Sequence, residues 1–234
     1  MTTPQRVKRA FDIVVASVSL IAGAPIMALV ILLIMVLEGR PIFYVSRRCV
    51  APDRTIPILK FRTMVRDAKS PKYRLQERFM RDGFLDIPRT CDVYTPIGRI
   101  LERLQIVELP QTLNVLFHGM SLIGNRPLPP ENVRLLRQHP GWSERFDSPA
   151  GITGIAQVVG KMWLSPRHRL DLEAGYSRTY QNGNILKCDA LILLATVRFI
   201  LTSKGLSPAK AYALVGMTAP SPEALVKTAA ASSR

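Results

Sequence analysis

The stretch from Val107 to Pro127, VELPQTLNVLFHGMSLIGNRP, contains one carboxylate, Glu108, and one guanidinium, Arg126. Glu108 lies at the start of an apolar run with roughly helical spacing, and Arg126 follows Gly124 in a loop that ends at a proline. An acidic group at a helix start, followed by a rigid loop that offers a guanidinium, is typical of a site that handles phosphate. A packed helix and turn with a solvated arginine is the competing interpretation, and both stay open at this point.

The overall composition narrows the partners of such a site. Of 234 residues, 32 are Lys or Arg and 17 are Asp or Glu, and the formal charge of +15 favours anionic partners. Hydrophobic residues make up 47% of the chain, which is high for so basic a protein and favours a membrane surface. No nucleic-acid partner is expected, because no helix-turn-helix spacing, zinc signature or aromatic RNA-binding motif accompanies the charge.

The most apolar segment, from Ile13 to Leu37, carries no charged residue. As a helix it is long enough to cross the roughly 30 Å hydrocarbon core of a bilayer. Gly23-Ala24-Pro25 lies at its middle, where proline removes a backbone hydrogen bond and bends a helix. Basic residues flank the segment on both sides, so the charge bias of a spanning helix is missing. Residues 1–38 therefore fit either a spanning helix or a re-entrant helix that breaks at Pro25 and returns to the same side.

Strands and helices are both expected after this segment. Two short strands should flank a turn at 51–53, and helical patterns cover 96–104, 131–138, 167–180 and 190–201. Residues 65–89 are dense in charge and predict either an amphipathic helix on an anionic bilayer or a solvated surface segment. The Ala/Ser/Pro-rich tail, 207–234, is expected to be disordered.

Several segments, taken in order, resemble one family: the bacterial sugar transferases, monotopic phosphoglycosyl transferases that initiate glycan assembly on a polyprenol phosphate. The segments are KRAFD at 8–12, GRPIF at 39–43, KFRTM at 60–64, TPIGR at 95–99, ELPQ at 108–111, NVL at 114–116, MSLIGNRP at 120–127, PAGITG at 149–154 and AQV at 156–158. The resemblance implies a re-entrant helix in the bacterial inner (cytoplasmic) membrane. It also implies a small mixed α/β catalytic domain over residues 39–206, with amphipathic interfacial helices, on the cytoplasmic face.

The resemblance further implies a polysaccharide-biosynthesis chemistry that uses an Asp–Glu pair. In the family the aspartate attacks the sugar-bearing phosphate of a nucleotide sugar, and polyprenol phosphate then takes the phosphosugar from the covalent intermediate. Mg²⁺ neutralises the diphosphate. Matched position by position, Glu108 is the glutamate of the pair and the expected catalytic residue. Lys60, Arg62 and Arg126 are expected to bind substrate phosphates, and no metal ligand is assigned.

The sequence departs from the family at the residue that should attack. That position holds Val107, which has no lone pair for phosphorus and no charge for a metal ion. Gly119 replaces an aspartate, and Asn125 replaces the first proline of a Pro-Arg-Pro loop. In one interpretation Glu108 acts as nucleophile, about 100° further round a helix. In the other, the chain is a pseudoenzyme that keeps the fold and membrane anchor and serves as a structural or binding subunit of a membrane protein complex.

Overall fold

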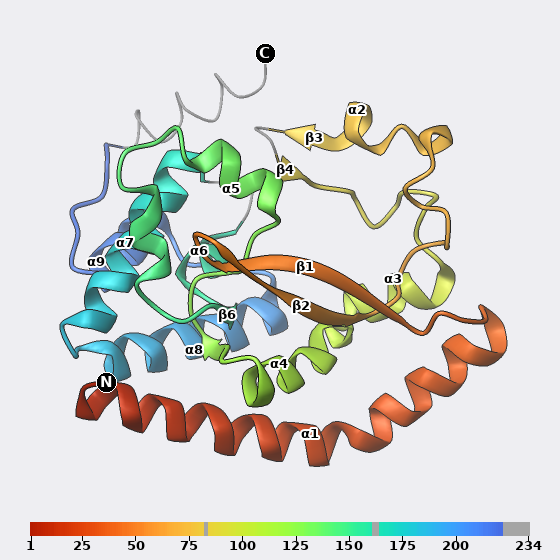
Figure 1. Cartoon of the computed structure of the whole chain (residues 1–234), viewed down its shortest axis with the longest axis horizontal. Coiled ribbons are helices and arrows are strands. Elements are labelled where there is room, and N and C mark those ends of the chain that lie inside the picture. Colours follow the sequence, from red (N-terminus) through yellow and green to blue (C-terminus); the bar gives the residue numbers. More distant parts are fainter. Residues whose placement is uncertain (82–83, 161–163, 222–234) are drawn as a thin grey trace.

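One long helix, α1 (Thr3–Leu37), forms one side of the molecule in the computed structural model, which describes residues 1–81, 84–160 and 164–221 (Figure 1). Its most apolar 18-residue window has a mean hydropathy of 2.9, and only 11% of that window is buried. By length and composition the helix is able to enter or cross a membrane. Pro25 lies inside the continuous helix, which bends along its length in Figure 1. The interruption expected at Pro25 is therefore a bend, in keeping with the single hydrogen bond that proline removes.

Both ends of α1 are fastened to the same domain. Near the N-terminus, Lys8 Nζ lies 2.6 Å from Asp189 Oδ2 of helix α8 (Ile185–Thr202) and donates to Ile123 O at 2.9 Å. Near the C-terminus, Val30 and Ile34 are buried in an apolar cluster of the domain. A straight spanning helix would carry one end away from the domain, so this arrangement favours the re-entrant interpretation.

An antiparallel hairpin follows α1. Strand β1 (Phe43–Ala51) pairs with β2 (Arg54–Phe61), which confirms the two strands predicted around a turn. Ile56 and Ile58 are buried, and Lys60 follows them on the same face of β2 at the edge of the core. The period of two along β2 therefore determines where Lys60 points.

Short helices and two small sheets complete the mixed α/β fold that the sequence predicted. Sheet β3–β4 is antiparallel, and sheet β5–β6 is parallel. The remaining elements are 3₁₀ helices Pro71–Tyr73, Ile106–Gln111 and Trp142–Phe146; helices α2 (Leu75–Phe79), α3 (Pro96–Arg103), α4 (Thr112–Phe117), α5 (Pro130–Leu136), α6 (Ile155–Val159), α7 (Pro166–Gln181) and α9 (Pro208–Leu214); and strands β3 (Met80–Arg81), β4 (Phe84–Leu85), β5 (Ser121–Ile123) and β6 (Gly151–Thr153). The charged segment 65–89 forms short elements, so the single amphipathic helix considered for it is wrong.

The largest core cluster lies between α6, α7, α8 and α9. Leu172 and Tyr176 of α7 and Ile192 of α8 have no exposed surface. Helix α9 adds Ala211 and Tyr212 to this cluster, so the disorder expected for the tail is wrong as far as residue 221. The alanine-rich composition of the tail gave no indication that Ala211 and Tyr212 are core residues. Residues 222–234 lie outside the described part of the chain.

Candidate active site

Three of the four predicted site residues meet, although they come from separate elements. Lys60 lies near the end of β2, Glu108 in the 3₁₀ helix Ile106–Gln111, and Arg126 in the loop after β5. Lys60 Nζ donates to Glu108 Oε1 at 2.6 Å. Arg126 forms a two-pronged ion pair with the same carboxylate, in which Nη2 donates to Oε1 and Nη1 donates to Oε2 at 3.3 Å. The carboxylate is thus held between two cations.

Val107 and Glu108 are consecutive residues of a 3₁₀ helix, so their side chains point in different directions. Successive side chains of a 3₁₀ helix are about 120° apart, further than the about 100° of an α-helix. Val107 is 4% exposed and packs with Val30 and Ile34 of α1. The side chain at position 107 therefore packs against α1, whereas the side chain at position 108 faces the cations.

Helix α1 also sets the place of this segment through Gly23. A Cβ atom added at Gly23 would lie 3.1 Å from Leu109 Cδ2, so the small residue allows the two segments to approach closely. Thr112 Oγ1 donates to Leu109 O at 2.8 Å and joins the 3₁₀ helix to α4. The residues on either side of Glu108 are therefore fixed against α1, and only Glu108 between them turns to the site.

The loop that carries Arg126 is positioned by a buried polar network. Arg145 Nη2 donates to Arg126 O at 2.8 Å, and Arg145 Nε donates to Glu173 Oε2 at 2.7 Å. Asn125 Nδ2 donates to the backbone oxygens of Arg145 and Glu173, both at 2.9 Å. No sequence pattern marks this network, because Arg145 and Glu173 are 28 residues apart and meet only in the folded chain.

The ion pairs decide the charge of Glu108. Burial by itself raises the pKa of this carboxyl, but Arg126 and Lys60 outweigh burial and hold the pKa well below its ordinary value. Burial lowers the pKa of Lys60, and Glu108 opposes that effect only in part. Glu108 is therefore a carboxylate at neutral pH, neutralised on both oxygens.

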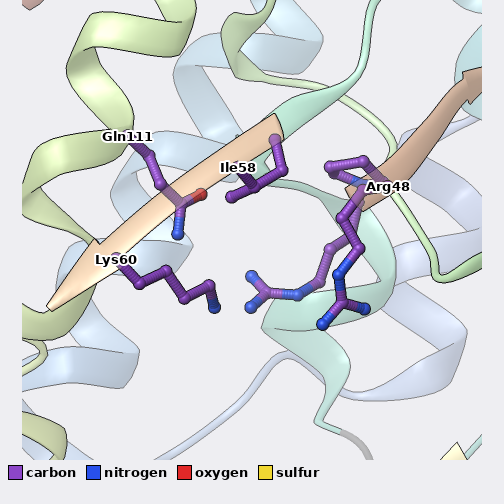
Figure 2. A pocket seen from close by; sticks show the side chains of 6 residues that line it. Arg48, Ile58, Lys60 and Gln111 are labelled. Atoms are coloured by element: carbon purple, nitrogen blue, oxygen red, sulfur yellow. The ribbon is translucent and has the colours of Figure 1, made fainter. Parts of the chain in front are cut away.

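A small hollow adjoins this cluster. It is shallow and open to solvent, and it is lined by Arg48, Ile58, Lys60, Gln111, Arg126 and Pro127. Figure 2 shows Arg48, Lys60 and Gln111 pointing into it from separate elements, with Ile58 beside them. The lining is cationic and donor-rich, which suits an anionic ligand. Arg48 and Gln111 were not among the residues predicted to form a site, although Gln111 belongs to the ELPQ motif.

Arg62 does not join the other predicted residues. Its Nη2 donates to Gly39 O at 2.8 Å and to Glu38 O at 3.2 Å, just past the end of α1. Strand β2 ends at Phe61, so the alternation that directs Lys60 does not extend to Arg62. Arg62 binds the backbone at the C-terminal end of α1, apart from the cluster around Glu108, and its contact with phosphate stays a prediction.

The site residues do not fit a magnesium ion held by the protein alone. Across residues 1–81, 84–160 and 164–221, no three His, Cys, Asp or Glu side chains are grouped closely enough to hold a metal ion. Mg²⁺ prefers a shell of oxygen ligands, and both oxygens of Glu108 already face cations. Magnesium at this site stays a prediction that depends on oxygens from a bound diphosphate.

Comparison with known proteins identifies relatives along nearly the whole chain. The family model described as "Bacterial sugar transferase" matches residues 3–203. The chain is 32% identical over 206 residues to "Exopolysaccharide production protein ExoY" of Sinorhizobium fredii, covering 85% of this chain and 87% of the relative. It is 31% identical over 199 residues to "Uncharacterized sugar transferase EpsL" of Bacillus subtilis, covering 85% and 89%. It is also 31% identical over 201 residues to "UDP-N-acetylgalactosamine-undecaprenyl-phosphate N-acetylgalactosaminephosphotransferase" of Aeromonas hydrophila, covering 85% of this chain and 44% of that relative.

Proposed function

This chain belongs to the bacterial sugar transferase family, and we propose that it binds a nucleotide sugar and polyprenol phosphate at the cationic site around Glu108. The relative from Aeromonas hydrophila is named for these two classes of substrate. The observation that carries the proposal is the meeting of Lys60 and Arg126 on one ionised carboxylate, with Arg48 lining the same hollow. Such a cluster binds phosphate through charge-assisted hydrogen bonds.

The catalytic step at position 107 is lost in the function that we propose. Val107 offers no nucleophile, and its side chain is buried against α1, whereas Glu108 faces the cations. The protein then acts as a substrate-binding or structural subunit of a membrane protein assembly. This interpretation explains why the phosphate-binding cations persist beside a position that has no attacking group.

Complete sugar-phosphate transfer is the second candidate, and a different observation favours it. Glu108 is ionised and lies in the site. In this candidate, substrate phosphates draw Lys60 and Arg126 away from the carboxylate, and a Glu108 oxygen then attacks the sugar-bearing phosphorus. Nucleoside monophosphate leaves, and a polyprenol phosphate oxygen displaces Glu108 from the acyl phosphate to form polyprenol diphosphosugar.

Attachment to the membrane follows from α1, and we place the domain on the cytoplasmic face of the bacterial inner membrane. Its exposed apolar side chains include Ile21, Leu29 and Val36, at 75%, 56% and 68% exposure. Both ends of the helix are fastened to one domain, so one-sided insertion keeps the site beside the bilayer. A site in that place receives a soluble nucleotide sugar from one direction and a lipid phosphate from the other.

The deciding experiment measures transfer of radiolabelled sugar phosphate from a nucleotide sugar to polyprenol phosphate by purified full-length protein in liposomes. Wild type, Glu108→Ala, Val107→Asp and Val107→Asn are compared, and equilibrium binding of the nucleotide sugar is measured in parallel. Binding without transfer by wild type supports the non-catalytic function. Transfer by wild type that disappears in Glu108→Ala establishes the second candidate. Absence of both binding and transfer would refute the two candidates together.

A further inference from the structure

Gln111 is a buried glutamine whose amide nitrogen faces the hollow without a partner. The residue is 3% exposed, and its Nε2 forms no hydrogen bond with any described residue. In Figure 2 this nitrogen points from the 3₁₀ helix toward the space beside Lys60. Buried donors are nearly always satisfied, and an unsatisfied one destabilises the fold. An acceptor atom supplied by a ligand would satisfy it.

Arg48 on β1 is a second donor without a charged partner on the same hollow. Its Nε donates to Ser46 Oγ at 2.9 Å, and within the described residues no carboxylate lies at ion-pair distance from its guanidinium. Burial and repulsion from the neighbouring Arg126 lower the pKa of Arg48, and they outweigh Glu131 and Glu108, which raise it. An anion in the hollow would relieve this repulsion.

The charge of the complete lining matches a diphosphate. Arg48, Lys60 and Arg126 of the lining are cations, and Glu108, which is paired with two of them, is a carboxylate, so these four side chains have a net charge of +2. In a nucleotide sugar the diphosphate is esterified at both ends and carries one negative charge on each phosphorus. The remaining lining residues, Ile58 and Pro127, contribute apolar surface and no competing acceptor side chain.

We propose that Arg48 and Gln111 are ligand-binding residues, and that together with Lys60 and Arg126 they form a donor cradle for the diphosphate of a nucleotide sugar. The inference rests on the proposed function and adds two residues that the family motifs did not assign. Arg48 neutralises one phosphate, and Gln111 Nε2 donates to a phosphate oxygen.

The test measures binding of inorganic pyrophosphate and of a UDP-sugar by calorimetry, at fixed salt, on full-length protein in detergent. Arg48→Met removes the charge and keeps an apolar stem, and Gln111→Leu removes the unpartnered donor at similar volume. Arg48→Met should weaken both ligands by about tenfold or more, and Gln111→Leu by about three- to tenfold. Gln111→Leu should also leave the ligand-free protein as stable as wild type or more stable, because no existing hydrogen bond is lost.

Two matched controls separate ligand binding from a structural role. Arg47→Met removes the same charge from the adjacent, exposed position of β1 and should leave binding within about twofold of wild type. Gln5 is another buried glutamine, but its Nε2 donates to Tyr180 O at 3.2 Å. Gln5→Leu should therefore lower the thermal midpoint without weakening pyrophosphate binding, the reverse of the result expected for Gln111→Leu.

The outcomes separate this inference from the proposed function. Wild-type affinity for both ligands in Arg48→Met and Gln111→Leu would overturn the inference, although UDP-sugar binding by wild type would still support the function. Pyrophosphate binding that needs both residues, without UDP-sugar binding, would keep the cradle and refute the function. Weakened binding of a soluble prenyl monophosphate with unchanged pyrophosphate binding would assign the two residues to the acceptor and overturn the inference.

Discussion

Replacing Val107 with aspartate restores the residue type of the attacking position, and the structure predicts a large stability cost. The side chain at 107 is 4% exposed among Val30, Ile34, Phe61 and Leu101. A carboxylate there loses its hydration without reaching Lys60 or Arg126, so its pKa in the folded protein rises. In the unfolded chain the aspartate pKa is about 3.9.

The size of the effect follows from the difference between these two pKa values. Because the folded pKa is the higher one, the variant loses stability as pH rises above the unfolded value, by about 1.4 kcal/mol per unit. The loss stops once pH passes the folded pKa. For an aspartate kept fully protonated in the folded state, this ionisation part of the cost is about 4 kcal/mol at pH 7 and under about 1 kcal/mol at pH 4, in addition to the pH-independent cost of burying a polar group. Val107→Asn buries a similar polar side chain that does not titrate, so the difference between the two variants isolates the charge.

The assay is denaturant unfolding of Val107→Asp and Val107→Asn in the same detergent between pH 4.5 and pH 8. The stability gap between the variants should widen steadily with pH. A gap that stays near zero, or an aspartate variant that becomes the more stable one above pH 5, would show that the side chain at 107 reaches the cations. That result would refute the conclusion that the side chain at position 107 packs against α1. The same variant would then be expected to gain sugar-phosphate transfer.

Three further perturbations have directions set by the structure. Glu108→Gln leaves Lys60 and Arg126 facing each other, so it should lower stability by about 1–3 kcal/mol at pH 7 and tighten pyrophosphate binding several-fold. Because the folded pKa of Glu108 is depressed, wild type alone should lose this stability as pH falls below about 4.3 in unfolding scans. EDTA should change calorimetric pyrophosphate affinity by less than about threefold, since side-chain cations supply the charge. Lys8→Met should cost about 3–5 kcal/mol in denaturant unfolding by stranding buried Asp189.

Each of these expectations has a result that contradicts it. Unchanged stability and unchanged pyrophosphate affinity in Glu108→Gln would mean that the two cations are not held by this carboxylate. Loss of pyrophosphate binding in EDTA, restored by added magnesium, would show that a metal ion enters with the diphosphate. A Lys8→Met protein as stable as wild type would show that solvent reaches Asp189. Lys8→Met/Asp189→Asn is its matched control and should recover part of the loss, because it leaves no unpaired buried charge.

Local patterns in the sequence predicted the hairpin, and the resemblance to the sugar transferase family supplied the three site residues that meet. Alternation along β2 directs Ile58 inward and Lys60 to the edge of the core, and both line the hollow. The position of Arg62 could not be found in the same way, since the alternation ends where the strand ends. The unpartnered state of Gln111 is also invisible in sequence, because it depends on which acceptors other segments fail to supply.

The backbone of residues 106–111 connects the site to α1. Sequence patterns did not predict which of its side chains packs against α1 and which faces the cations. A helical pattern indicates that neighbouring side chains diverge, but only the tertiary structure shows that Val107 packs against α1 and Glu108 against the cations. One turn of this helix thus contacts α1 through Val107 and contacts Lys60 and Arg126 through Glu108. A substitution at position 107 therefore acts first on the packing of α1, whereas a substitution at position 108 acts first on the two cations.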